Sequence, residues 1–342
     1  MALAQGAVGP VAAAGGEAQA LAFVAPRVRL LLQRVLPTSR PGARWLEIRL
    51  RLGGPIGVVT EAGDLWVGET GAVPVGAAAA CAEEDLRRTL QLITGSSVYA
   101  WEDELGQGFC TLPGGHRAGL CGRAVCRQGR IRTQKAFGSI NLRIARAVPG
   151  VAEPLLAQLG GRSGALPSLL LFGPPGSGKT TVLRDLCRQL STGRPDHGLR
   201  PRRVAIVDER SEIAACAEGR PQFDLGPRVD VLDGAPKAEG LGLLIRAMGP
   251  EVVACDEIGG PADAHALREA ARSGVAVLAT AHAGSAADLR RRPALRAALA
   301  AGAFDLVCEL RPDRGLGVPL ALSGAGAWPE SGDGGRHRWV AR

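Results

Sequence analysis

One eight-residue segment, Gly173-Pro-Pro-Gly-Ser-Gly-Lys-Thr180, constrains the fold of this chain more than any other. It satisfies the pattern G-x-x-x-x-G-K-[ST], in which glycines and backbone N–H groups suit the phosphates of a nucleotide. The apolar run 169–172 before it predicts a buried strand, and residues 181–190 after it have the spacing of a helix. A strand, a glycine-rich loop and a helix N-terminus together form an anion site. The segment therefore predicts a P-loop in an α/β domain.

The residues of this loop are expected to bind ATP together with Mg²⁺. The nucleotide-binding set is Gly173, Pro174, Pro175, Gly176, Ser177, Gly178, Lys179, Thr180 and Thr181. We expect Lys179 to reach the β- and γ-phosphates and Thr180 to bind Mg²⁺. The chain has only three lysines, Lys135, Lys179 and Lys237, so composition alone does not explain a lysine at this position.

The amino-acid composition bears on whether the protein binds nucleic acid, spans a membrane or is secreted. The net charge of +8 comes almost wholly from arginine and accompanies high Ala and Gly, so it is weak evidence for nucleic-acid binding. We find no run of the roughly 18 apolar residues that a membrane span needs, and residues 1–20 lack the features of a signal peptide. Eight cysteines without a C-x-x-C pair predict reduced core residues in a cytoplasmic protein.

The length favours two domains. We expect a disordered tail at 1–20, an N-terminal α+β domain at 21–147, a linker at 148–166, a P-loop ATPase domain at 167–312 and a disordered tail at 323–342. In the second domain, apolar runs at 169–172, 204–208, 252–256, 275–280 and 305–310 alternate with helical patterns. Such alternation predicts βαβ units and a parallel sheet. The expected fold class is therefore α/β, a P-loop NTPase domain preceded by a smaller α+β domain.

Two acidic clusters follow predicted strands of the second domain. Asp256 and Glu257 end the first cluster, and we expect Asp256 to bind Mg²⁺ and Glu257 to act as the catalytic base. Asp208, Glu209 and Glu212 form the second, and could face the γ-phosphate or Mg²⁺, with Asp208 or Glu209 as the competing candidate for the catalytic base. The alternatives are solvated turn acids for the first cluster and helix-capping acids for the second.

A third group of polar residues follows the apolar strand at 275–279. Thr280 and His282 are expected to emerge at the same sheet edge as Asp256 and to sense the γ-phosphate. Four arginines are candidates to neutralise phosphate charge, from within a subunit or across a subunit boundary: Arg246, Arg228, Arg123 and Arg132.

The stretch 105–152 contains eight basic residues and no acidic one. It could meet nucleic acid, lipid or the nucleotide of a neighbouring subunit. Phe109 and Phe137 are its only aromatic rings, which weakens the case for nucleic acid because base stacking needs such rings.

Four of these segments resemble, in the same order, the motifs of type II and type IV secretion ATPases. Residues 173–181 resemble their phosphate loop, 207–212 their aspartate box, 256–258 their Walker B end and 280–286 their histidine box. This resemblance implies a RecA-like ATPase domain.

A resemblance over about residues 30–310 is more specific, to the family of stage III sporulation protein AA. Its segments include Leu112-Pro-Gly-Gly-His-Arg117, Asn141-Leu-Arg-Ile-Ala-Arg146 and Pro236-Lys-Ala-Glu-Gly240. The resemblance implies a cytoplasmic mother-cell ATPase, peripheral at the membrane facing the forespore, that powers a channel complex. Its partners would be membrane-embedded subunits and other copies of itself in a ring, with six copies expected and no nucleic acid. The chain departs from the family at Met248-Gly-Pro250 and Phe137-Gly-Ser139, away from the expected phosphate and Mg²⁺ groups.

Two other functions remain open. One is a P-loop ATPase that acts on nucleic acid through its basic N-terminal domain. The other is a scaffold that binds nucleotide with little turnover, against which the presence of Lys179, Thr180, Asp256 and Glu257 argues.

Overall fold

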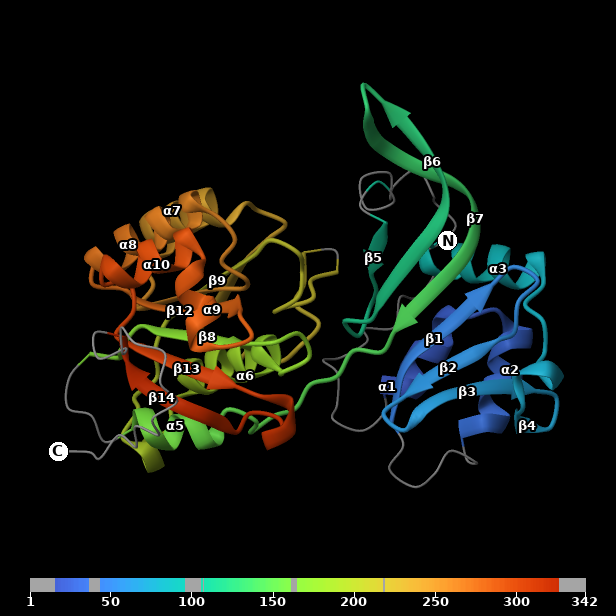
Figure 1. Ribbon diagram of the computed structural model, residues 1–342, viewed down its shortest axis with the longest axis horizontal. Coiled ribbons are helices and arrows are strands. Elements are labelled where there is room, and N and C mark those ends of the chain that lie inside the picture. Colours follow the sequence, from blue (N-terminus) through green and yellow to red (C-terminus); the bar gives the residue numbers. More distant parts are fainter. Residues whose placement is uncertain are drawn as a thin grey trace, which may run out of the picture. The chain divides into compact units, whose positions relative to one another are not determined.

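The computed structural model describes residues 16–36, 44–95, 106, 108–160, 165–217 and 219–325, which form two compact units (Figure 1). The N-terminal unit comprises Met1–Ala147 together with Ala215–Phe223, and the C-terminal unit comprises Val148–Ala214 and Asp224–Arg342. The chain therefore passes from one unit to the other three times.

An antiparallel sheet of seven strands, in the order β4-β3-β2-β1-β7-β6-β5, forms the N-terminal unit. The strands are β1 Trp45–Arg51, β2 Gly57–Thr60, β3 Gly63–Gly68, β4 Gly71–Val73, β5 Phe109–Thr111, β6 Arg117–Arg127 and β7 Arg130–Arg143. The helices are α1 Gly16–Ala20, η1 Leu21–Phe23, α2 Pro26–Val35, η3 Val75–Ala77 and α3 Glu83–Ile93. Helix α2 buries Val28, Leu31, Leu32 and Val35, the i, i+3, i+4, i+7 face of an amphipathic helix, in the core of this unit.

Strands β6 and β7 extend as a two-stranded ribbon beyond the other strands of their sheet (Figure 1). The sequence predicts a strand at 140–146, whereas β7 begins at Arg130, because the outer part of the ribbon is largely exposed and gives no apolar alternation. Within it Arg123 lies directly opposite Lys135, and Arg127 directly opposite Arg130. Like charges in directly opposed positions, such as those of Arg123 and Lys135, are destabilising.

The C-terminal unit is built on a second sheet of seven strands, in the order β10-β9-β11-β12-β8-β13-β14. All neighbours are parallel except β13 and β14. The strands are β8 Leu169–Gly173, β9 Val204–Asp208, β10 Val229–Asp233, β11 Val252–Cys255, β12 Ala276–His282, β13 Leu306–Leu310 and β14 Pro319–Gly324. The predicted parallel sheet is thus confirmed, and its interior strand β8 is wholly buried.

Helices cover both faces of this sheet (Figure 1). They are α5 Glu153–Leu159, α6 Lys179–Thr192, η5 Pro195–His197, α7 Lys237–Met248, α8 Pro261–Arg272, α9 Ala286–Arg291, α10 Pro293–Ala300 and η6 Pro312–Arg314. Leu170 and Phe172 of β8 share one core cluster with Leu241 of α7 and Leu267 of α8. Because β9, β11, β12 and β8 run in parallel, their carboxyl ends meet at one edge, where polar residues follow three of them.

Ordered elements lie inside segments expected to be tails or a linker. Gly16–Ala20 form α1, and β14 extends to Gly324. Helix α5 lies within the expected linker 148–166 and buries Leu155, Leu156 and Leu159, because its apolar residues pack into the C-terminal unit. The outer parts of both expected tails fall outside the described residues, and the other domain limits stay predictions.

Candidate nucleotide-binding site

The P-loop joins β8 to α6 and places the helix N-terminus at the edge of the sheet. Gly176 and Gly178 have φ of 76° and 81°, the left-handed region that glycine adopts without strain. A Cβ at Gly173 would lie 2.2 Å from the backbone oxygen of Leu310, so only glycine fits there. No side chain caps α6, and the first N–H groups of a helix have no partner within it. The loop therefore offers these N–H groups to an anion.

A pocket of about 250 Å³ lies beside this helix N-terminus. Its lining consists of Gly176, Gly178, Lys179, Thr180, Thr181, Glu212, Asp256, Glu257, Thr280 and His282. Four segments that are far apart in the sequence thus meet at one site, as the ends of parallel strands predict. Other predicted site residues, Asp208, Glu209 and Arg246 among them, are not part of this lining among the described residues.

Lys179 is buried at the base of the loop, with 6% of its surface exposed. Its Nζ donates to the carbonyl oxygens of Gly173 (3.0 Å) and Pro174 (2.9 Å). It also lies 3.1 Å from Nδ1 of His282, which accepts the bond when the imidazole is neutral. Burial lowers the pKa of Lys179 to about 8, because desolvation disfavours the ammonium. A phosphate in the pocket would compensate that loss of solvation.

Three carboxylates, those of Glu212, Asp256 and Glu257, line the pocket against the single ammonium of Lys179. A divalent cation bound with the polyphosphate would reduce the repulsion between the phosphates and these carboxylates. Asp256 is only 2% exposed, and its Oδ1 is buried without a hydrogen bond. Burial raises its pKa to about 6, with Lys237 opposing that rise. Oδ1 lies 3.4 Å from Nζ of Lys237. The carboxylate of Asp256 shares the pocket with Thr180, and these two oxygen-bearing side chains fit Mg²⁺, which prefers oxygen ligands.

Glu257 differs from Asp256 in being half-exposed at the mouth of the pocket, with 41% of its side chain accessible. Nε2 of His282 lies 3.7 Å from Glu257 Oε2, and Nη1 of Arg210 lies 3.8 Å from the same oxygen. His282 thus lies between the P-loop lysine and Glu257 and can orient both.

The three acids of the aspartate-box segment have three different environments. Asp208 is fully buried and accepts backbone N–H bonds from Glu212 (2.8 Å), Ile213 (3.0 Å) and Ala214 (2.7 Å). Glu209 forms an ion pair with Lys237, and Glu212 lines the pocket. The alternative left open by the sequence was the capping of a following helix, but the described residues between β9 and β10 contain no helix, and Asp208 instead binds the backbone of a loop.

Lys237 is a site-adjacent residue that the motif analysis did not select. It lies at the start of α7, 6% exposed, between Glu209 and Asp256. The sequence gives two signals for it: the chain has only three lysines, and Lys237 lies in the family-like segment Pro236-Lys-Ala-Glu-Gly240.

None of the four candidate arginines is among the described residues that line the pocket. Arg246 is exposed near the end of α7, and Arg228 donates to the backbone oxygen of Ser191 at 3.0 Å. Arg123 and Arg132 are exposed on the β6–β7 ribbon of the N-terminal unit.

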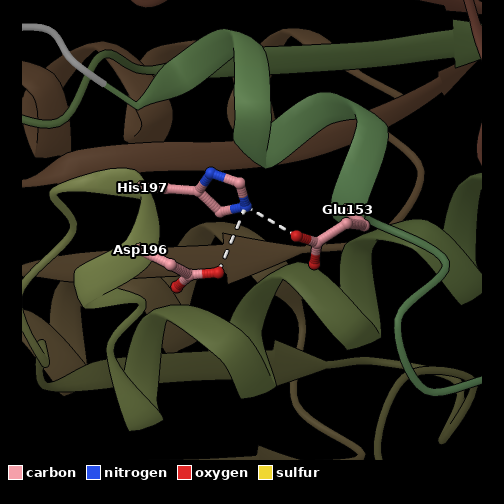
Figure 2. A group of neighbouring side chains, drawn as sticks. All are labelled: Glu153, Asp196 and His197. Carbon is pink, nitrogen blue, oxygen red and sulfur yellow. Dashed lines mark hydrogen bonds and ion pairs between the residues drawn. The ribbon is translucent and has the colours of Figure 1, made fainter.

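A separate polar cluster joins α5 to η5 (Figure 2). Nε2 of His197 lies 2.6 Å from Glu153 Oε1 and 3.8 Å from Asp196 Oδ2, an arrangement that could hold a metal ion. The guanidinium of Arg194, however, pairs with both carboxylates and lowers the pKa of each to about 2. Arg194 therefore supplies the positive charge of this cluster. Its ion pairs attach α5 to η5 within the C-terminal unit.

The sequence and the fold of this chain are both similar to those of known proteins. The sequence pattern of the family described as "Sporulation stage III, protein AA" matches residues 17–318. The chain belongs to this family. It is 42% identical over 297 residues to Stage III sporulation protein AA of Bacillus subtilis (strain 168), which covers 84% of this chain and 92% of that protein. It is also 31% identical over 187 residues to the uncharacterized protein ycf45 of Porphyra purpurea, 53% of this chain and 31% of that one.

The fold has a counterpart among solved structures. The Legionella pneumophila ATPase DotB matches it with a TM-score of 0.51 and 17% identity, over 82% of this chain and 74% of that one. The expected fold class, a RecA-like P-loop domain preceded by an N-terminal domain, is confirmed. Among the described residues, none of the helices combines the length and apolarity that crossing a membrane requires.

Proposed function

We propose that this chain binds ATP with Mg²⁺, hydrolyses it, and uses the energy as the motor of a sporulation channel or secretion complex. The observation that carries this proposal is the pocket itself. It brings the P-loop residues Lys179 and Thr180 together with Asp256 and Glu257, which follow β11, a strand separated from β8 by β12. Membership in the sporulation family supports a role in sporulation, and the similarity of the fold to that of an ATPase supports the hydrolysis of ATP.

The residues of the pocket divide the chemistry among them. The loop N–H groups and Lys179 bind the phosphates, while Thr180 and Asp256 hold Mg²⁺. Bound Mg²⁺ supplies neutralisation of the charge that develops on the transferring phosphoryl group. Glu257 orients the attacking water and accepts its proton, since it is a partly exposed carboxylate of the lining that lies beside His282. His282 orients both side chains, with Nδ1 toward the ammonium of Lys179 and Nε2 toward the carboxylate of Glu257.

The assembly is part of the same proposal. We place the protein in the mother-cell cytoplasm, peripheral at the membrane facing the forespore and bound to membrane-embedded subunits. Copies of the chain would form a ring, of six subunits by analogy with secretion ATPases. Arg123 and Arg132 of the exposed ribbon would approach the nucleotide of a neighbouring copy and neutralise charge in the transition state.

A steady-state ATPase assay on purified protein tests the proposal. Lys179→Ala is expected to abolish turnover, because the phosphates lose their buried ammonium. Glu257→Gln is expected to bind ATP and hydrolyse it at least about 100-fold more slowly, the loss typical of a general base. Glu269→Gln, an exposed acid of α8, is the matched control and should keep the wild-type rate. Wild-type turnover by Lys179→Ala would refute the P-loop assignment.

The ribbon also favours a second candidate, an ATPase that acts on nucleic acid. Its opposed like charges, Arg123 with Lys135, would suit a phosphate backbone. DNA or RNA binding whose affinity falls steeply with salt, as counterion release requires, would support this candidate over the channel motor.

A further inference from the structure

Lys237 occupies a position that is unfavourable for a lysine. It is the first residue of α7, where the helix dipole disfavours a positive charge, and it is 94% removed from solvent. A buried ammonium normally has a lowered pKa, yet the pKa of Lys237 is raised by its contacts with Glu209 and Asp256. The two carboxylates therefore hold the charge in place against both penalties.

The two carboxylates come from neighbouring strands. Glu209 follows β9 and Asp256 follows β11, and these strands are parallel, with Val207 opposite Cys255. Nζ of Lys237 is ion-paired with Oε2 of Glu209 and lies 3.4 Å from Oδ1 of Asp256. The ammonium thus connects two strand ends with the start of α7.

The pocket lies on one side of this connection. Asp256 lines it, whereas neither Lys237 nor Glu209 belongs to the part of the described chain that forms its wall. The ammonium therefore meets Asp256 from outside the pocket and keeps Glu209 outside as well. Without that ion pair, a fourth carboxylate would be free to turn toward phosphates that already face Glu212, Asp256 and Glu257.

We propose that Lys237 is a positioning residue that holds Glu209 out of the nucleotide pocket and fixes Asp256 within it. The proposal rests on the pocket being the nucleotide site proposed above. It assigns to Glu209 the role of counter-ion for Lys237, and it leaves Glu212 as the acid of the aspartate box that faces the ligand.

The test measures binding of a fluorescent ATP analogue without Mg²⁺, so that its readout is independent of turnover. Lys237→Met is expected to weaken this binding about tenfold, because a released carboxylate adds repulsion near the phosphates. Glu209→Gln alone should change it less than about twofold, and the double variant should recover most of the loss, a coupling that separate roles would not produce. Arg296→Met removes an exposed positive charge from α10 and is the charge-matched control.

Two outcomes would overturn the proposal. One is Mg²⁺-free binding by Lys237→Met equal to that of the wild type. The other is a double variant that binds as weakly as Lys237→Met, since pairing with Glu209 would then not be the cause. If Lys237→Met alone does not fold, the double variant is compared with the wild type: binding within about threefold supports the proposal, and binding about tenfold weaker overturns it. If the wild-type protein binds the analogue but does not hydrolyse ATP, the ATPase proposal is refuted. The binding test of Lys237 still applies in that case.

Discussion

Replacing Asp208 with Asn is expected to destabilise the protein rather than to remove a catalytic group. The carboxylate of Asp208 is fully buried at the end of β9 and accepts three backbone N–H bonds of 2.7–3.0 Å from the loop that follows. This loop contains two non-glycine residues with left-handed backbone, Ser211 (φ 51°) and Ala215 (φ 50°). Such conformations cost free energy, of order 1 kcal/mol each, that the bonds to Asp208 offset.

The expected loss of stability depends on which carboxylate oxygen of Asp208 accepts each backbone bond. Oδ2 accepts from Ile213 and Ala214, and Oδ1 accepts from Glu212. An asparagine can place its single oxygen at the Oδ2 position and keep two bonds, but its NH₂ group then faces the N–H of Glu212. One charge-assisted bond is lost and two buried donors oppose each other, so we expect a loss of about 3 kcal/mol in the free energy of unfolding.

Urea-induced unfolding of the full chain, followed by circular dichroism, measures this loss. At a temperature where the variant remains folded, its ATP turnover per folded molecule should stay within about threefold of the wild type, because Asp208 does not line the pocket. Glu257→Gln should show the opposite behaviour, with unchanged stability and lost turnover. An Asp208→Asn protein that keeps its stability within about 0.5 kcal/mol but loses hydrolysis would refute the reasoning and make Asp208 a catalytic residue.

Three further predictions concern other parts of the chain. Gly173→Ala should lower stability by at least about 3 kcal/mol in a denaturant titration, since its Cβ would meet backbone at 2.2 Å; unchanged stability would contradict the loop geometry. Burial lowers the pKa of His116 to about 4 from 6.5, so stability should fall by up to about 3 kcal/mol as the pH drops from 6.5 toward 4, and His116→Gln should flatten that slope. Mixing the double variant Arg123→Ala, Arg132→Ala with Lys179→Ala should partly restore hydrolysis, and turnover per molecule should rise with concentration; a flat profile without rescue would mean that each subunit works alone.

The sequence predicts the parallel sheet and the pocket well because both depend on contiguous patterns. Apolar runs such as 204–208 are recognisable alone, and polar residues directly after them must meet at one sheet edge. Edge strand β10 was missed, since it is half-exposed and lacks a continuous apolar run. The functions of Asp208 and Lys237 could not be read from local patterns either. An acid after a strand has the same sequence signature whether it binds a cation or caps a loop, and the partners of Lys237 lie 28 and 19 residues away in the chain.

The division of the chain into interleaved units has a consequence for protein dissection. The segment Ala215–Phe223 belongs to the N-terminal unit, where Gln222 accepts the N–H of Gly114 at 2.9 Å. Phe223 is 5% exposed and packs where a Cβ on Gly115 would lie 3.0 Å from its ring. A fragment that ends at residue 147 would lack both partners and would uncover apolar surface, so we expect it to be less stable than the same unit in the full chain. Exchange of this half between relatives, in the laboratory or in evolution, would have to move two separate pieces of sequence together.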